Sequence, residues 1–223
     1  MKELQIYNNL LQLPLFLGIS KNDISLIVAH TRFNFSTIRA GKDIVKEGDP
    51  CHELFFILNG KVEIKTVSDD GSYYVTEISE GPSVIQANRL FGLHQRYTRT
   101  YKALEDCKLF SLDKKEVLRL CDQFVIFRIN ILNLLSMENQ RYEHRPWKKV
   151  PQTLEDKITR FFEEHCIYPA GPKTFYIKMN QLALEVNDSR LDVSRALNNM
   201  QDAQRLTLYR GRIFIPALEK LLM

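Results

Sequence analysis

The chain has 223 residues, of which 44% are hydrophobic and 26% charged. These proportions are typical of a globular protein with one large or two small domains, and they exclude a disordered chain. The excess positive charge, +4 at pH 7, lies entirely in residues 141–223, where 14 Lys and Arg accompany 10 Asp and Glu. A local basic bias of this kind is typical of a nucleic-acid surface, and also of a solvated basic face.

The cysteines and the N-terminus indicate the cell compartment. The four cysteines are Cys51, Cys107, Cys121 and Cys166. They form no CxxC pair and no metal-ligand spacing with the five histidines, so we interpret them as reduced thiols and expect neither a metal nor another cofactor. The adjacent Cys51-His52 leaves a metal or redox site open as the minor alternative.

The apolar run near the N-terminus is broken by Asn8, Asn9 and Pro14 and has no small-residue cleavage site. It therefore predicts a short surface helix and not a signal peptide. No segment reaches the ~18 apolar residues that a membrane span needs. We therefore expect a soluble cytoplasmic protein without membrane association.

Helical and strand patterns divide the first half of the chain. Up to about Thr31 the sequence predicts helix, with Ser20 as the N-cap of a segment that carries Ile24, Ile27 and Val28 on one face. From Phe33 to Leu112, short apolar runs alternate with turn signals, and Asn59-Gly60 and Asp70-Gly71 are typical of hairpins. Strands at this spacing predict one antiparallel barrel or roll.

A long stretch without Gly or Pro follows, from Lys114 to about His144, with Asp113 as its expected cap. One apolar stripe has heptad spacing: Leu120, Phe124, Phe127, Ile131 and Leu134. A second set lies off that stripe: Ile126, Ile129 and Leu132. We interpret the segment as one helix that packs on the roll and, through the heptad stripe, on a twin helix across a two-fold axis. A buried core helix is the alternative.

Pro146 and Pro151 mark a boundary, after which the pattern changes again. The remaining chain predicts a helix capped by Thr153, a strand, two short helices separated by a turn at Asn187-Asp188, and a hairpin that turns at Arg210-Gly211. Such an order places two helices directly before a hairpin.

The second of those short helices, which is predicted to start at Ser189, has two unlike faces. Its predicted buried stripe is Val193, Ala196, Leu197 and Met200. Its polar face is Arg190, Ser194, Arg195, Asn198 and Asn199. Arg can donate to O6 and N7 of guanine, Asn can pair with adenine, and Ser189 at the helix N-terminus can contact a phosphate. This face therefore predicts a DNA-reading helix, with a solvated face as the alternative.

Roll, long helix, helix pair and hairpin together resemble the Crp/Fnr family of bacterial transcription regulators. "AGKDIVKEGDPCHELFFILNGKVEI" resembles the family's roll, and "DSRLDVSRALNNM" resembles its recognition helix. The resemblance implies an α+β fold: a jelly-roll or cupin-like effector domain similar to cyclic nucleotide-binding domains, a dimerisation helix, and a winged helix-turn-helix. We expect the domains at residues 1–112, 113–146 and 147–223.

The resemblance also assigns roles. Arg190 and Arg195 correspond to the family's base-reading arginines, while Leu191 stands where cyclic-AMP-sensing members have a glutamate that accepts from cytosine. The expected DNA-binding residues are Lys178, Gln181, Ser189, Arg190, Ser194, Arg195, Asn198, Arg210 and Arg212. The implied partners are a palindromic double-stranded operator, a second copy of the chain, and RNA polymerase.

The segment "GPSVIQANRLFGLHQRYTRTYKA" aligns with the family's phosphate cassette, of the form F-G-E-L-x-L followed by R-S/T-A. Gln86 falls on its glycine, Ala87 on the ribose-binding glutamate, and Tyr97 on the phosphate-binding arginine. These departures argue against a cyclic nucleotide. The remaining candidates for an effector site are Arg89, Arg96, Tyr97, Thr98 and Arg99, and an unfamiliar anion or a degenerate pocket stay open.

Two other classes of function compete with a regulator. One is a sensory module that binds a cyclic nucleotide or another anion without base-specific DNA binding. The other is a cupin-like enzyme, which requires a cluster of metal-binding His and Glu in the roll. The roll contains His52 and His94 but no HxH pair, so we expect no enzyme.

Overall fold

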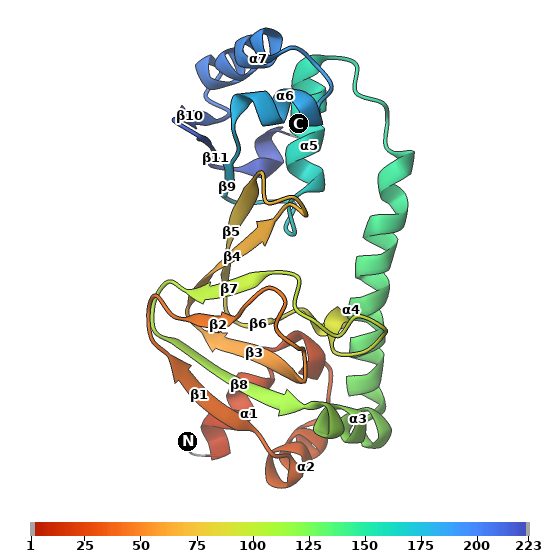
Figure 1. Cartoon of the computed structure of the whole chain (residues 1–223). Helices are drawn as coiled ribbons and strands as arrows, with labels where there is room; N and C mark the ends of the chain where they lie inside the picture. Colours follow the sequence, from red (N-terminus) through yellow and green to blue (C-terminus); the bar gives the residue numbers. More distant parts are fainter. Residues whose placement is uncertain (1–2, 222–223) are drawn as a thin grey trace. The chain divides into compact units, whose positions relative to one another are not determined.

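The computed structural model describes residues 3–221, which divide into two units (Figure 1). The N-terminal unit comprises the chain up to Val62 together with Ser79–His144. The C-terminal unit comprises Glu63–Ile78 together with the chain from Arg145 onward. The stretch 63–78, which the sequence placed within the roll domain, therefore groups with the C-terminal unit.

The N-terminal unit begins with helices α1 (Glu3–Leu10), η1 (Pro14–Phe16) and α2 (Lys21–His30). Ser20 caps α2 as predicted, because its Oγ accepts a hydrogen bond from the Asp23 N–H at 3.1 Å. Ile24 and Ile27 are both buried, which confirms the predicted inward face.

Two antiparallel strand groups form the roll of this unit. Its strands are β1 (Asn34–Ile38), β2 (Asp43–Val45), β3 (Glu53–Asn59), β6 (Ser83–Val84), β7 (Thr100–Ala103) and β8 (Cys107–Asp113). One sheet has the order β1-β8-β3-β6, and β2 pairs with β7. Phe56 and Phe110 stack between β3 and β8 with ring centroids 4.6 Å apart. The predicted antiparallel roll is confirmed.

The prediction of a hairpin at Asn59-Gly60 is wrong. Strand β3 pairs with β8 and β6, so the chain leaves this sheet after Asn59. Gly60 has φ +112°, and a Cβ atom there would lie 2.6 Å from Cys107 Sγ. The pair is therefore a corner at which the backbone passes close to β8, and only glycine fits it.

The prediction of one long helix is also wrong. Asp113 caps α3 (Lys114–Gln123) as expected, but Phe124 is extended and α4 (Val125–His144) sets off at a bend of 117°. Leu120 on α3 and Phe127 on α4 are both fully buried, and the Phe127 ring lies 5.2 Å from that of Phe16. The bend allows apolar side chains of both helices to enter one core.

Burial corrects the predicted dimer stripe. Leu120 and Phe127 are inaccessible within their own unit and cannot contact a second copy, while Phe124, Ile131 and Leu134 are partly buried. The apolar side chains that α4 exposes are Val125, Ile126, Ile129, Leu132 and Met137. The exposed apolar face is therefore the second set, off the heptad stripe.

The C-terminal unit contains the tip of a hairpin formed by β4 (Lys61–Val67) and β5 (Tyr74–Glu80), and every element after α4. Those elements are η3 (Arg145–Trp147), α5 (Leu154–Glu164), β9 (Lys173–Tyr176), α6 (Met179–Glu185), α7 (Arg190–Asp202), β10 (Thr207–Tyr209), β11 (Arg212–Ile215) and η4 (Leu218–Leu221). Their succession is the predicted one. Within this unit the strands lie in the order β4-β5-β9-β11-β10.

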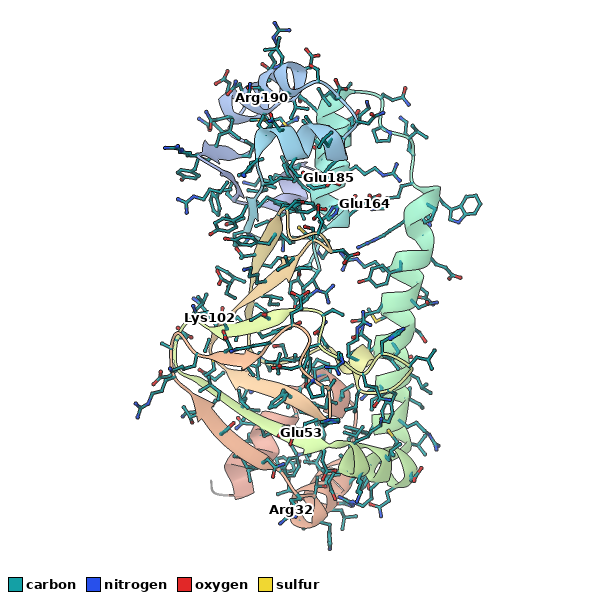
Figure 2. The ribbon with its side chains drawn as sticks, in the orientation of Figure 1. Arg32, Glu53, Lys102, Glu164, Glu185 and Arg190 are labelled. Atoms are coloured by element: carbon teal, nitrogen blue, oxygen red, sulfur yellow. The ribbon has the colours of Figure 1, made fainter. Side chains whose placement is uncertain are left out.

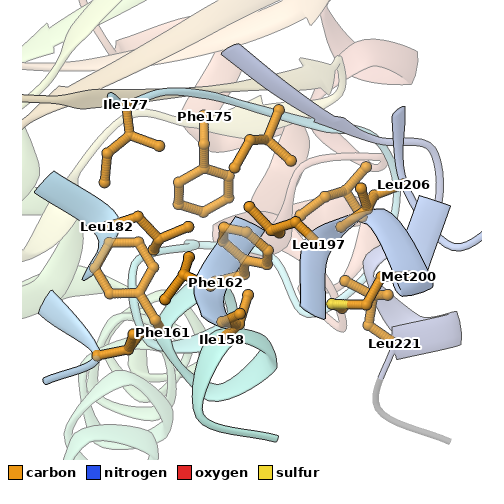
Figure 3. Packing of buried hydrophobic residues seen from close by; sticks show 14 of the residues in the cluster. Ile158, Phe161, Phe162, Phe175, Ile177, Leu182, Leu197, Met200, Leu206 and Leu221 are labelled. Atoms are coloured by element: carbon orange, nitrogen blue, oxygen red, sulfur yellow. The ribbon is translucent and has the colours of Figure 1, made fainter. Parts of the chain in front are cut away.

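One apolar core holds this unit together (Figure 3). Phe161 and Phe162 of α5 pack towards Phe175 of β9, with Leu182 of α6 and Leu197 of α7 in the same cluster. At the start of α5, Thr153 and Asp156 form a capping box, which confirms the predicted cap. The core fixes both helices of the α6–α7 pair against β9.

Asp70 at the hairpin tip should make a pH-dependent contribution to stability. Hydrogen bonds from Ser72 and Ser68 to Asp70 lower the pKa of its carboxyl to about 2. A carboxyl with a depressed pKa in the folded state stabilises it above its unfolded pKa, and this stabilisation fades as the pH falls towards 2. The stability difference between wild type and Asp70→Asn in urea unfolding should therefore shrink between pH 5 and pH 3. A stability difference between wild type and Asp70→Asn that stays unchanged over this pH range would contradict the assignment.

Over residues 3–221, no single helix has the length and apolar character that a membrane span requires. Helices α3 and α4 reach this length and apolar composition only together, and the chain bends by 117° between them.

Candidate functional site

A tight turn sets the angle between α6 and α7. Asn187 has φ +50°, and the Asp188 N–H donates to Ala183 O at 3.0 Å, which closes α6. Ser189 then caps α7, since its Oγ accepts from the Asp192 N–H at 3.1 Å. The cap leaves Arg190 as the first residue of the helix.

Burial divides α7 into the two predicted faces. The predicted inner stripe is buried throughout: Val193, Ala196, Leu197 and Met200. On the other side Arg190, Arg195 and Asn198 are exposed and Ser194 is half-buried. Figure 2 shows Arg190 on α7 at the surface of the C-terminal unit. The structure therefore brings the predicted polar residues onto one exposed face.

The side chains on this face are only weakly held. Arg195 lies 3.4 Å from Asp192 Oδ1, but both side chains are more than half exposed. Exposed pairs of this kind contribute little to stability, so Arg195 can change partner at small cost. On α6, Gln181 donates to Glu185 at 2.8 Å, and Lys178 is exposed at the N-cap.

The hairpin β10–β11 supplies the other predicted cations. Gly211 takes φ +74° at its turn, beside Arg210. The Arg212 guanidinium lies 4.4 Å from the centre of the Tyr209 ring. A groove of about 330 Å³ runs between α6 and this hairpin, and its lining includes Lys178, Arg210 and Arg212. Three of the predicted DNA-binding cations therefore share one concave surface.

Sequence reasoning missed Tyr209, which is half exposed and lines the same groove. Its position in "LTLYRGRIF", three residues before Arg212 across the turn, was the available signal. Its ring holds the guanidinium in place and adds an aromatic face to the groove.

In the N-terminal unit, two residues of the cassette segment, Gln86 and Thr98, hydrogen-bond to each other. Gln86 is buried and has φ +36°, immediately before η2 (Ala87–Arg89). Its Nε2 donates to Thr98 Oγ1 at 2.7 Å, and its Oε1 accepts from the Thr98 N–H at 3.1 Å. Gln86 thus occupies both the hydroxyl and the backbone donor that Thr98 offers.

Two of the predicted effector residues have structural partners. Tyr97 is buried and donates from its hydroxyl to Glu53 O at 2.8 Å, and burial raises the pKa of its phenol well above the usual range. Arg96 is exposed and donates to Gly48 O at 2.7 Å. Tyr97 thus fixes the segment to the start of β3, and Arg96 fixes it to the turn at Gly48.

Arg89 and Arg99 lie near a carboxyl that the sequence did not single out, Glu138 on α4. Burial raises the pKa of Glu138, while the charges of Arg99 and Arg89 act in the opposite direction. Nε of each arginine and Oδ1 of Asn88 are buried without a hydrogen-bond partner. This cluster is the part of the cassette that retains unsatisfied polar atoms.

Among the described residues, no group of three or more His, Cys, Asp or Glu side chains is placed to hold a metal ion. None of the four cysteines forms a disulfide, and burial raises the pKa of the Cys51, Cys107 and Cys121 thiols. A raised pKa keeps these thiols protonated and poorly reactive at neutral pH.

Residues 35–124 match the cyclic nucleotide-binding domain family. Among curated proteins, the chain is 27% identical over 122 residues to "Probable cyclic nucleotide-gated ion channel 14" of Arabidopsis thaliana. That alignment covers 51% of this chain and 16% of the channel, so the chain spans only a small part of that relative.

Solved structures resemble the chain over a longer range. The catabolite activator protein of Thermus thermophilus is 20% identical, with a TM-score of 0.52 and coverage of 94% of this chain and 96% of that one. The sensor domain of the transcriptional regulator DNR of Pseudomonas aeruginosa is also 20% identical, with a TM-score of 0.52 and coverage of 69% and 99%. Residues 35–124 thus match a cyclic nucleotide-binding domain, and the chain has the fold of the catabolite activator protein.

Proposed function

We propose that this chain, with its cyclic nucleotide-binding domain and Crp/Fnr-type fold, is a non-enzymatic cytoplasmic transcription regulator that binds a palindromic DNA operator as a homodimer. The observation that carries the proposal is the exposed face of α7, on which Arg190, Arg195 and Asn198 project without strong partners. RNA polymerase is a further proposed partner.

The α6–α7 pair and the β10–β11 hairpin form the proposed winged helix-turn-helix. Arg190 and Arg195 are proposed to read guanines in the major groove, and Asn198 to pair with adenine. Ser189 and Gln181 contact phosphates beside the helix N-termini, and Ser194 contributes from the same face. The cations of the groove, Lys178, Arg210 and Arg212, bind the DNA backbone.

Leu191 limits which base the operator can carry at the position that this side chain faces. Its side chain is 60% exposed on α7, between the two proposed base-reading arginines. An exposed leucine cannot accept a hydrogen bond from cytosine, but it can contact a thymine methyl group. We therefore propose a thymine at the operator position that Leu191 faces.

The salt dependence of DNA binding tests this function. Each phosphate contact releases counterions, so the logarithm of the binding constant should fall linearly with the logarithm of the salt concentration. Binding to a selected operator and to random DNA should show this slope, with a constant preference for the operator. Binding without sequence preference would favour a sensory module whose C-terminal unit is only an interaction surface.

The dimer is proposed to form through the exposed apolar face of α4, and this gives a second prediction. Ile129→Glu combined with Leu132→Glu places two charges on that face, which should convert a dimer into a monomer in sedimentation velocity. Leu184→Glu, at a side chain 74% exposed in the other unit, is the matched control and should stay dimeric. A wild-type monomer at micromolar concentration, or a dimeric double variant, would refute the interface.

We propose that the cassette takes no cyclic nucleotide, because Gln86 donates to the Thr98 hydroxyl and accepts from the Thr98 backbone N–H, while Ala87 and Tyr97 replace the expected contacts. Cyclic AMP and cyclic GMP at millimolar concentration should therefore produce no calorimetric binding signal. A saturable signal that Thr98→Val removes would contradict this prediction.

The unsatisfied atoms of Arg89 and Arg99 favour one alternative input, a small anion beside Glu138. Inorganic phosphate is the probe: if this input exists, phosphate should raise the melting temperature of wild type and leave an Arg89→Gln/Arg99→Gln variant unchanged. An equal response of both proteins would leave the cassette without an anionic input.

A further inference from the structure

The hairpin Glu63–Ile78 matches one domain by sequence but folds with the other unit. It lies inside the residues that match the cyclic nucleotide-binding domain, 35–124, yet it folds as part of the C-terminal unit. At Val62 and Ser79 the chain continues into the N-terminal unit. The C-terminal unit therefore contains a structural element whose two ends are covalently joined to the effector-like domain.

Strand β5 of the hairpin extends the sheet of the C-terminal unit. It pairs antiparallel with β9 over four residues, from Tyr74 opposite Tyr176 to Glu77 opposite Lys173. The two tyrosine rings stack with centroids 4.3 Å apart, and Lys65 Nζ lies 4.1 Å from the Tyr74 ring. Backbone pairing and cross-strand stacking thus act together at this edge of β9.

A buried ion pair fastens the hairpin. The side chains of Glu77 and Lys173 are each 1% exposed, and Lys173 Nζ donates to Glu77 Oε2 at 2.8 Å. The same carboxylate accepts from the backbone N–H groups of Ile167 at 2.7 Å and Tyr168 at 3.1 Å. Removal of Glu77 would leave a buried ammonium and two backbone donors without this acceptor, so the hairpin and β9 depend on each other.

The hairpin also enters the core of the C-terminal unit. Tyr73 and Val75 are members of the cluster that holds α6 and α7. The Tyr73 hydroxyl lies 2.9 Å from His165 Nε2, at the end of α5. An undocked hairpin would open this core as well as the edge of the sheet.

Strand β9 connects the hairpin Glu63–Ile78 to the proposed DNA-binding elements. It lies between β5 and β11, and α6 begins three residues after β9 ends at Tyr176. The hairpin and β10 lie on opposite sides of the β9–β11 pair, so the docked hairpin leaves the wing free. Because β9 pairs with β11 and leads into α6, a change in how the hairpin docks on β9 can affect both the wing and α6.

We infer that the hairpin Glu63–Ile78 is a latch whose docking on β9 holds the C-terminal unit ready for DNA, and whose release lowers operator affinity. The inference rests on the proposed function for its DNA readout. A signal would then be transmitted through the pairing of β5 with β9 and through the buried Glu77–Lys173 ion pair.

The test uses the full-length protein and a selected operator. Glu77→Gln keeps a side-chain oxygen but leaves Lys173 unpaired, and should lower operator affinity about tenfold. Adding Thr76→Cys and Thr174→Cys places thiols at directly opposed residues, where a disulfide can form. After oxidation, the crosslinked Glu77→Gln protein should recover wild-type affinity to within about twofold. The same protein under reduction, with the disulfide mapped by mass spectrometry, is the matched control.

Two results would overturn the latch: Glu77→Gln with wild-type affinity, or a loss of affinity that the crosslink does not restore. Amide hydrogen exchange provides a readout without DNA. Glu77→Gln should accelerate exchange in β5 and β9, and the crosslink should slow it again. If wild type shows no operator preference, the proposed function fails, while the exchange measurement still confirms or refutes the latch.

Discussion

Replacement of Arg190 and Arg195 together by alanine should abolish the preference for operator over random DNA. Each arginine that pairs with a guanine contributes about 1–3 kcal/mol of discrimination, since alanine leaves the O6 and N7 acceptors without a donor. Both side chains lie on the exposed face of α7 and take no part in the core, so the variant should fold normally. Competition binding with operator and random duplexes measures the effect.

Arg210→Ala is the informative control for this double variant. Arg210 lines the groove beside the hairpin and is proposed to contact phosphate. Its loss should weaken binding to all duplexes by similar factors and reduce the salt slope by about 1, without changing the preference. An unchanged preference in the Arg190 and Arg195 variant would refute their base-reading role.

Lys173→Met should be the most destabilising single substitution among the ion pairs of the C-terminal unit. It leaves the Glu77 carboxylate buried without its cation, which costs about 3–5 kcal/mol of the free energy of unfolding. The double variant Glu77→Gln/Lys173→Met removes both charges and keeps one acceptor oxygen for the N–H groups of Ile167 and Tyr168, so it should recover part of that loss. Urea unfolding of the wild type, the two single variants and the double variant yields the coupling energy.

Lys157→Met is the matched control, because Lys157 pairs with Asp188 at 3.4 Å in the same unit but is 41% exposed. Exposed pairs contribute about 0–1 kcal/mol, so this variant should stay close to wild type. A similar loss in Lys157→Met and Lys173→Met would show that burial of the Glu77–Lys173 pair is not what makes it important.

Local signals in the sequence predicted much of the fold. Ser20, Asp113 and Thr153 each cap the helix that they were expected to cap. A cap depends on a hydrogen bond across three residues, so its signal is contained in a short stretch of chain. The two faces of α7 follow in the same way from helical periodicity.

Features that depend on distant residues could not be predicted in this way. The break at Phe124 follows from the burial of Leu120 and Phe127 in one core, whereas heptad spacing alone favours a continuous helix. The pairing of β5 with β9 joins residues about a hundred positions apart, and nothing local in either strand specifies that partner.

The cassette segment also contains contacts that the sequence could not predict. Alignment to the phosphate cassette identified Gln86 and Thr98, but not the two hydrogen bonds between them. Those bonds need Gln86 at positive φ, which is uncommon for a residue other than glycine. Glu138 was missed because α4 brings it beside Arg89 and Arg99 from about forty residues away.

Selection from a random pool of duplexes tests whether the chain reads a DNA sequence as a dimer. We expect enrichment of a palindrome whose half-sites lie one helical turn apart, with guanines in each half-site and a thymine that disappears from the consensus when Leu191 is changed to Glu. A pool that shows no enriched sequence after repeated selection with the dimeric wild-type protein would contradict it.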